Sequence, residues 1–220
     1  MKKIVLFDID NVLIEGQTQK LLIHFLLKKR RIKLLFFLKL YFWFLFYRLG
    51  LIKDTIKIRE KAFKSLTGWD EVEAKQLFKY FFEEYIKPRI FNESIDMIRT
   101  HINHGYEVIL VSASLSEIVD EFKKYLSLKF AISTKLEIVN GVYTGKILGN
   151  IPYGENKVKA AKIFLEDKDF ALEESYAYAD HFSDLPLLEM VRNPVVVNPD
   201  SKLRKIATKR KWTIYDFKRR

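Results

Sequence analysis

The sequence contains no cysteine among its 220 residues. A disulfide scaffold, a zinc site built from thiolates and a cysteine nucleophile are therefore excluded. The N-terminus also lacks the long apolar run of a signal peptide, because the run from Ile4 to Phe7 is followed at once by Asp8 and Asp10. We expect a short buried strand there, and a mature N-terminus in the cytoplasm.

Proline is absent between Gln17 and Leu66, and Gly50 is the only glycine inside that stretch. The pattern predicts a long helical block, followed by a helix from an N-cap at Asp70 to about residue 85. After Pro88, strands and helices alternate, which implies a parallel sheet with right-handed crossovers. Strands are predicted at 4–7, 107–111, 176–179 and 194–197, with a hairpin in 129–148 around Asn140-Gly141.

The predicted fold class is therefore α/β, with a Rossmann-like parallel sheet sandwiched by helices. The helical block between the first strand and the rest of the sheet is predicted to be an insertion. We expect residues 1–14 and 87–220 to form the catalytic core, and residues 15–86 to form an all-helical cap domain.

Acidic residues are scarce in two regions of a chain whose formal net charge is +11. Residues 15–60 hold eleven Lys and Arg against three acids, and residues 200–220 hold nine against two. Such basic regions favour anionic partners, which are a phosphorylated substrate, a membrane surface or nucleic acid. Nucleic acid ranks last, because no fold that recognises it is apparent.

Polar residues follow the predicted strands at their carboxyl ends, where open parallel sheets bind ligands. Asp8 and Asp10 follow the first strand, and two carboxylates held this close favour a divalent cation such as Mg²⁺ between them. The alternative is that both residues cap a loop.

Three further signals occur at corresponding places. Ser112 follows the second strand and suits a phosphate oxygen, although taken alone it is better explained as an ordinary helix N-cap. Lys157 lies in the first turn of a helix, where a cation opposes the helix dipole, and a solvated surface lysine is the alternative. Asp180 can supply a further metal carboxylate, with Asp184 behind it.

Taken together, these motifs resemble the haloacid dehalogenase superfamily of phosphohydrolases. The match is closest to its phosphoserine phosphatase-like branch, subfamily IB, in which a helical C1-type cap follows the first strand. The motifs in question are Phe7-Asp8-Ile9-Asp10-Asn11-Val12-Leu13, Val111-Ser112-Ala113-Ser114, Lys157 and Asp180 to Asp184.

The resemblance implies a magnesium-dependent phosphatase that forms an aspartyl-phosphate on Asp8. Asp10 would protonate the leaving oxygen and then activate water. It further implies metal binding by Asp8, Asp180 and the Asp10 backbone carbonyl, with Asp184 in support. Substrate phosphate would be held by the remaining polar residues of the motifs, Asn11, Ser112 and Lys157.

The resemblance also leaves alternatives open. A phosphotransferase can use the same aspartyl-phosphate, and a membrane-associated binding protein could keep the fold without turnover. Dehalogenases are disfavoured, because their leaving halide needs no acid such as Asp10. Phosphoserine as substrate is weakened by Gln17, which stands where those phosphatases carry a glutamate, and by Ala113-Ser114 in place of Gly-Gly.

The run from Leu34 to Tyr47 is almost entirely apolar and aromatic, and Lys28-Lys29-Arg30-Arg31 precedes it. It is too short to span a bilayer and contains Lys39. Two interpretations remain, which are a helix buried in the core of the cap and a helix that lies in a membrane interface. The second would favour a lipid-related substrate and a peripheral location at the inner face of the membrane, whereas the first leaves the protein in the cytoplasm.

Overall fold

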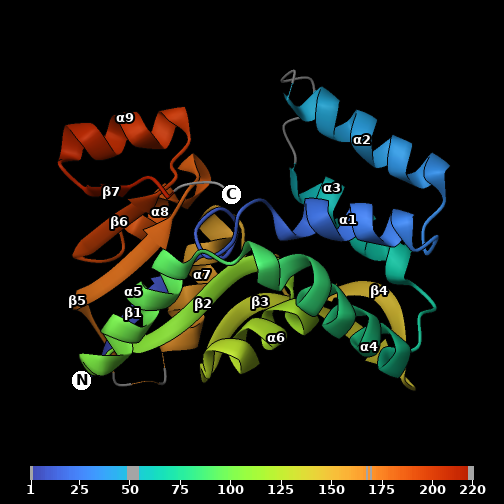
Figure 1. Ribbon diagram of the computed structural model, residues 1–220, viewed down its shortest axis with the longest axis horizontal. Helices are drawn as coiled ribbons and strands as arrows, with labels where there is room; N and C mark the ends of the chain where they lie inside the picture. Colours follow the sequence, from blue (N-terminus) through green and yellow to red (C-terminus); the bar gives the residue numbers. More distant parts are fainter. Residues whose placement is uncertain (1, 49–54, 167, 169, 218–220) are drawn as a thin grey trace.

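The computed structural model describes residues 2–48, 55–166, 168 and 170–217. Its centre is a seven-stranded sheet in the order β4-β3-β2-β1-β5-β6-β7 (Figure 1). The strands are β1 (Lys2–Phe7), β2 (Glu107–Leu115), β3 (Phe130–Val139), β4 (Val142–Leu148), β5 (Phe170–Ala179), β6 (Asn193–Val197) and β7 (Thr213–Tyr215). Neighbouring strands are parallel, except that β4 runs antiparallel to β3.

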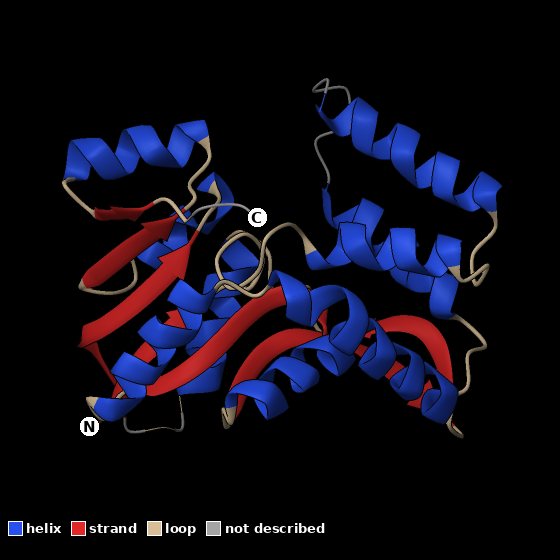
Figure 2. Cartoon of the chain, in the orientation of Figure 1, coloured by secondary structure: helices blue, strands red, loops and turns tan. Residues whose placement is uncertain are grey.

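Helices cover both faces of this sheet (Figure 2). They are α5 (Asn92–Asn103), α6 (Ser116–Leu126), α7 (Glu155–Leu165), α8 (Leu185–Leu188) and α9 (Ser201–Arg210). Alternate residues of β1 point to opposite faces. Val5 and Phe7 join the apolar cluster that contains residues of α5 and α6, whereas Ile4 and Leu6 join the one that contains residues of α7, α8 and α9. The expected α/β class is confirmed.

The predicted helical block after β1 is divided into separate helices. These are α1 (Thr18–Lys28), α2 (Leu34–Arg48), α3 (Thr55–Phe63) and α4 (Glu71–Phe81), with a 3₁₀ turn at Lys64–Leu66. A π-helical turn (Phe82–Ile86) and a 3₁₀ turn (Lys87–Arg89) follow α4. Asp70 caps α4 as predicted, since its carboxylate accepts hydrogen bonds from the N–H groups of Val72 and Glu73.

The four inserted helices differ in what they contact. α1, α2 and α3 stand beyond the carboxyl ends of the central strands, whereas α4 lies along α6 (Figure 1). The segment before α4 is also tied to the β3–β4 hairpin, because the Gly68 N–H donates to the Tyr143 carbonyl at 2.8 Å. The hairpin therefore contacts the inserted segment and helps to fix its position.

Several strands differ from the sequence prediction. β2 continues through Ser112 to Leu115 instead of ending at Val111, β5 begins at Phe170 instead of Tyr176, and β7 is not among the predicted strands. Ser112 is consequently part of a strand and not a helix N-cap, because the residue before α6 is Leu115.

Candidate active site

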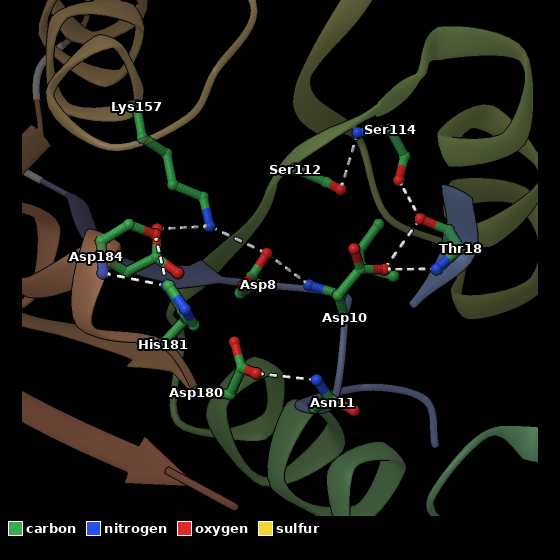
Figure 3. Close-up of polar contacts among 12 residues, drawn as sticks. Asp8, Asp10, Asn11, Thr18, Ser112, Ser114, Lys157, Asp180, His181 and Asp184 are labelled. Carbon is green, nitrogen blue, oxygen red and sulfur yellow. Dashed lines mark hydrogen bonds and ion pairs between the residues drawn. The ribbon is translucent and has the colours of Figure 1, made fainter. Parts of the chain in front are cut away.

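Four polar side chains from separate segments meet at the carboxyl end of the sheet (Figure 3). Asp8 directly follows β1, Ser112 lies near the end of β2, and Asp180 directly follows β5. Lys157 reaches them from the first turn of α7. All four side chains are buried, which places the polar groups in a medium where their mutual interactions are strong.

Lys157 is the cation that ties two of the acids together. Its Nζ lies 2.9 Å from Oδ1 of Asp8 and 3.1 Å from Oδ1 of Asp184. The side chain is 4% exposed, so the alternative of a solvated surface lysine is wrong. Burial opposes its charge, but Asp184 and Asp8 outweigh burial and raise the pKa of the Lys157 ammonium.

Asp8, Asp180 and Asp184 form a compact cluster of carboxylates. One oxygen from each lies within 4.8 Å of the others, and all three residues are buried. Three buried acids with one shared lysine carry excess negative charge, which a bound cation would offset. A site made wholly of carboxylate oxygens suits Mg²⁺, so these residues fit the ion that the sequence analysis expected.

The cluster changes the acidity of its members. Burial raises the pKa of Asp8 to about 7, with Asp184 and Asp10 adding to the effect and Lys157 opposing it. Burial likewise raises the pKa of Asp180 well above its usual range, and the charge of Asp8 adds to this.

Asp10 faces away from this cluster and toward the inserted helices. Its Oδ1 accepts hydrogen bonds of 2.8 Å from both the N–H and the hydroxyl of Thr18, the first residue of α1. The Thr18 hydroxyl is in turn hydrogen bonded to that of Ser114 at the end of β2. Burial raises the pKa of Asp10, although the two Thr18 bonds oppose the shift.

The expectation that the Asp8 and Asp10 carboxylates share one cation is therefore not met. It assumed that the strand continues, so that residues i and i+2 share a face. β1 ends at Phe7, and Asp10 lies in the loop beyond it. That loop turns the two carboxylates to different neighbours.

Asn11 lies beside Asp180. Its amide nitrogen donates to Oδ2 of Asp180 at 2.8 Å, and its amide oxygen accepts from the Gly16 N–H at 3.2 Å. Both polar ends of the side chain are thus used within the protein. Asn11 is therefore placed to orient Asp180, and its assignment to substrate phosphate stays a prediction.

A cavity of about 490 Å³ opens over these residues. Its floor contains the polar groups described above, and its walls come largely from α1, α2 and the segment 59–66. Most of the wall is apolar, with side chains from Leu22, Ile23, Leu26, Ile32, Phe36, Phe37, Phe63, Leu66 and Leu115. A small phosphate ester with an apolar body would fit such a space.

Arg59 of α3 adds a cation to this wall, and the sequence analysis did not identify it. Its guanidinium lies 4.6 Å from the ring centre of Tyr153 and donates a hydrogen bond to Gln19. Gln19 donates onward to the carbonyl of Ala113 at 3.2 Å. Arg59, Gln19 and Thr18 carry no motif spacing, so their position depends on how the helices pack.

Comparison with known proteins identifies the family of the chain. The family of haloacid dehalogenase-like hydrolases matches residues 5–189. The chain belongs to this family. The resemblance noted from the sequence is thereby confirmed, and so is the parallel-sheet fold that the family implies.

Individual relatives are similar over most of this chain. A probable phosphatase of Mycobacterium tuberculosis (strain ATCC 25618 / H37Rv) is 34% identical over 180 residues, which are 81% of this chain and 62% of that protein. A phosphoserine phosphatase of the same strain is 30% identical over 165 residues, 75% of this chain and 54% of that one. The chain thus spans less than two thirds of these relatives.

A solved structure matches almost the whole chain. It is a protein of unknown function from Bordetella pertussis Tohama I, 28% identical, with a TM-score of 0.90. The match covers 98% of this chain and 99% of that one, so it includes the inserted helices as well as the sheet.

Proposed function

We propose that the protein is a magnesium-dependent phosphatase that hydrolyses a phosphate monoester through an aspartyl-phosphate on Asp8. The observation that carries this proposal is the meeting of Asp8 with Lys157, Asp180 and Ser112 at one buried point below a cavity. A carboxylate next to a fixed cation and other acids is suited to attack phosphorus, because the developing charge on the phosphoryl oxygens is stabilised in place.

Asp8 is the proposed nucleophile. One of its oxygens forms the bond to phosphorus while the bond from phosphorus to the ester oxygen breaks. Asp8 must be ionised to react, and its contact with Lys157 favours that form. Ser112 and Lys157 would hold the phosphoryl oxygens during the transfer.

Asp10 is the proposed acid and base. Its raised pKa favours a protonated carboxyl that can donate to the leaving oxygen. After the alcohol leaves, the same carboxylate would take a proton from water as the water attacks the aspartyl-phosphate. The hydrogen bonds from Thr18 would hold Asp10 in one orientation through both steps.

Asp8, Asp180 and Asp184 offer the oxygens near which Mg²⁺ would bind, with the Asp10 carbonyl as a further ligand and Asn11 orienting Asp180. The ion would supply positive charge against the phosphoryl oxygens. This assignment makes Asp184 a candidate direct ligand of the metal, whereas the sequence analysis expected it only to support the ligands.

We further propose that residues 15–86 act as the cap and that the substrate is a small or lipid-related phosphate ester. The apolar wall from α1 and α2 suits a substrate with an apolar body. Arg59 suits a hydrogen-bond acceptor or an anionic group on that substrate, beyond the phosphate. Gln17 lines the cavity without the charge that would pair with an ammonium group. A peripheral location at an anionic membrane surface would suit a lipid-related substrate.

Hydrolysis of a panel of phosphate esters tests the proposal. The panel contains phosphoserine, sugar phosphates, lysophosphatidate and phosphatidylglycerophosphate, each assayed with Mg²⁺ and with EDTA. We expect release of phosphate in Mg²⁺ and none in EDTA. Asp8→Asn should lower kcat by a factor of about 10⁴ or more, since the nucleophile is lost while the shape of the site is kept.

Two results would contradict this function. Normal turnover by Asp8→Asn would rule out the nucleophile, and phosphate transfer to an added alcohol in preference to water would indicate a phosphotransferase. Far-ultraviolet circular dichroism of Asp8→Asn serves as the folding control.

A further inference from the structure

One side of α2 exposes six large apolar side chains to solvent. They are Leu34, Leu35, Leu38, Tyr41, Phe42 and Phe46, which we call the outer face. Their spacing of three and four residues places them along one side of the helix. Leu35 is 65% exposed and Phe42 is 49% exposed, so the interpretation of α2 as a helix buried in the cap is wrong for this side.

The opposite side of α2 is engaged within the protein. Phe36 and Phe37 line the cavity, and Trp43 lies under the ammonium of Lys61 at 3.5 Å from the ring centre. α2 lies at the periphery of the molecule, with α1 and α3 between it and the sheet (Figure 1). The helix is thus held from one side, and its other side presents an apolar surface of the kind that marks a docking site.

Basic side chains lie beside the outer face. Lys28 at the end of α1, then Lys29, Arg30, Arg31 and Lys33 before α2, are exposed, and Lys39 is exposed on the helix itself. Residues 16–53 contain nine Lys and Arg and no Asp or Glu. These exposed basic residues, which we call the rim, all carry positive charge, and their complement is an anionic surface.

We propose that the outer face of α2 docks onto an anionic lipid bilayer, with the helix lying in the plane of the interface. Apolar side chains would enter the boundary between headgroups and acyl chains, while the basic rim contacts lipid phosphates. A span across the bilayer is not compatible with α2, because 15 residues extend about 22 Å, which is short of the ~30 Å hydrocarbon core. In the part of the chain that the structure describes, no helix meets the length and apolarity of a membrane span.

A second copy of the chain is a poorer occupant of this surface. Two copies would bring like-charged rims together, in a protein whose formal net charge is +11. Repulsion between such rims opposes association, whereas an anionic leaflet is attracted by them.

The docked orientation has a consequence for access to the cavity. Tyr41 belongs to the outer face and also lines the cavity, so the two surfaces are continuous at this residue. A bilayer on the outer face would therefore lie beside the cavity wall. This inference goes beyond the proposed phosphatase reaction, and vesicle binding can be measured without any substrate.

Co-sedimentation with vesicles tests the proposal. The probes are vesicles of phosphatidylcholine alone and of phosphatidylcholine mixed with phosphatidylglycerol. We expect binding to the mixed vesicles that weakens as NaCl is added, and much weaker binding to the neutral ones. The double variant Leu35→Gln/Phe42→Gln should bind the mixed vesicles about tenfold or more weakly, because two side chains no longer insert.

Matched controls distinguish binding by the outer face from non-specific binding by exposed apolar or basic side chains elsewhere. Val72→Gln/Ile163→Gln removes two exposed apolar side chains from α4 and α7, and it should bind like the unaltered protein. Lys33→Gln/Lys39→Gln should lower the affinity for mixed vesicles and flatten the salt dependence, whereas Lys202→Gln/Lys209→Gln on α9 should change neither. Hydrolysis of a water-soluble ester by Leu35→Gln/Phe42→Gln without vesicles reports whether the fold is intact.

Equal binding by Leu35→Gln/Phe42→Gln and the unaltered protein would overturn the proposal. So would a dimer in sedimentation velocity that this variant abolishes, combined with no binding to either vesicle. In that case a second copy covers the outer face.

Discussion

At the scale of single residues, the site holds more negative charge than its own cation balances. Lys157 contacts Asp8 and Asp184, whereas the hydrogen bond of Asp180 comes from the neutral amide of Asn11. Asp180 and Asp184 therefore differ in what they do for the metal-free protein. Asp180 adds repulsion among buried acids, and Asp184 supplies half of an ion-paired arrangement.

This difference predicts opposite effects of two similar substitutions. In EDTA, Asp180→Asn should raise the free energy of unfolding by about 1 kcal/mol, because one buried charge is removed and the bond to Asn11 can be kept. Asp184→Asn should lower it by about 1–3 kcal/mol, because Lys157 loses a charged partner. Urea denaturation of both variants measures the two values.

Added Mg²⁺ should make Asp180→Asn less stable to unfolding than the unaltered protein, which is the reverse of their order in EDTA. A ligand at about 100 times its Kd stabilises the folded state by about 2.7 kcal/mol, and a variant that has lost a ligating oxygen forgoes most of this gain. A metal-free Asp180→Asn protein that is less stable than the unaltered one would contradict the assignment of Asp180 as an uncompensated acid.

The residues of the site were predictable from the sequence to different degrees. Asp8 and Asp180 directly follow strands, Ser112 lies within β2 and Lys157 lies in the first turn of α7. The general geometry of a parallel sheet brings such residues together. The direction in which each side chain points was less accessible. Asp10 departs from the predicted direction because β1 ends at Phe7. Beyond that residue the loop backbone, and not the strand, sets the direction of the side chain.

At the scale of secondary-structure elements, the β3–β4 hairpin meets the insertion at Gly145. This residue has φ +76°, and a Cβ placed on it would lie 2.2 Å from Oγ1 of Thr67 and 3.3 Å from the Cα of Lys64. Gly149, at the end of the same hairpin, has the same φ of +76° and no atom within 4 Å of such a Cβ. Comparing substitutions at the two glycines therefore distinguishes the cost of backbone strain from the cost of close packing.

Alanine substitutions at these glycines should differ in cost. Gly149→Ala carries the strain of a positive φ, about 1–2 kcal/mol. Gly145→Ala carries the same strain and a further ~1–3 kcal/mol, because Thr67 must move. Denaturant unfolding of both variants, and of Gly145→Ala/Thr67→Ala, which should recover part of the extra cost, measures the difference. Equal costs for the two single variants would show that the contact with Thr67 is not tight.

The elements were predicted best where periodicity and turn residues agree. The Asn140-Gly141 hairpin and the Asp70 cap are local signals, and both are present in the structure. β7 is three residues long and is the edge strand beside β6, so its sequence alone carries little information. The outer face of α2 could not be predicted either, because an almost wholly apolar helix gives no sign of which side is covered.

At the scale of the whole molecule, the cavity lies between two parts of the chain that contribute different chemistry. The sheet, its following loops and α7 supply the acids, the lysine and Ser112, and the inserted helices supply most of the apolar wall and Arg59. Arg59 also connects the two parts, since it contacts Tyr153 beside α7 and reaches Ala113 through Gln19. Its charge also lowers the pKa of Asp10, against the larger effect of burial.

Arg59→Met should therefore weaken catalysis more than folding. We expect kcat/KM for the best ester of the panel to fall about tenfold to hundredfold, mainly through KM, because a cation beside the bound substrate is lost. Lys61→Met is the matched control, as it removes an equal charge from the same helix at a side chain that lies over Trp43. Steady-state kinetics of both variants, with thermal unfolding as the folding control, make the comparison. Equal losses in the two variants would mean that the helix acts through its overall charge, and Arg59 would then have no part in recognising the substrate.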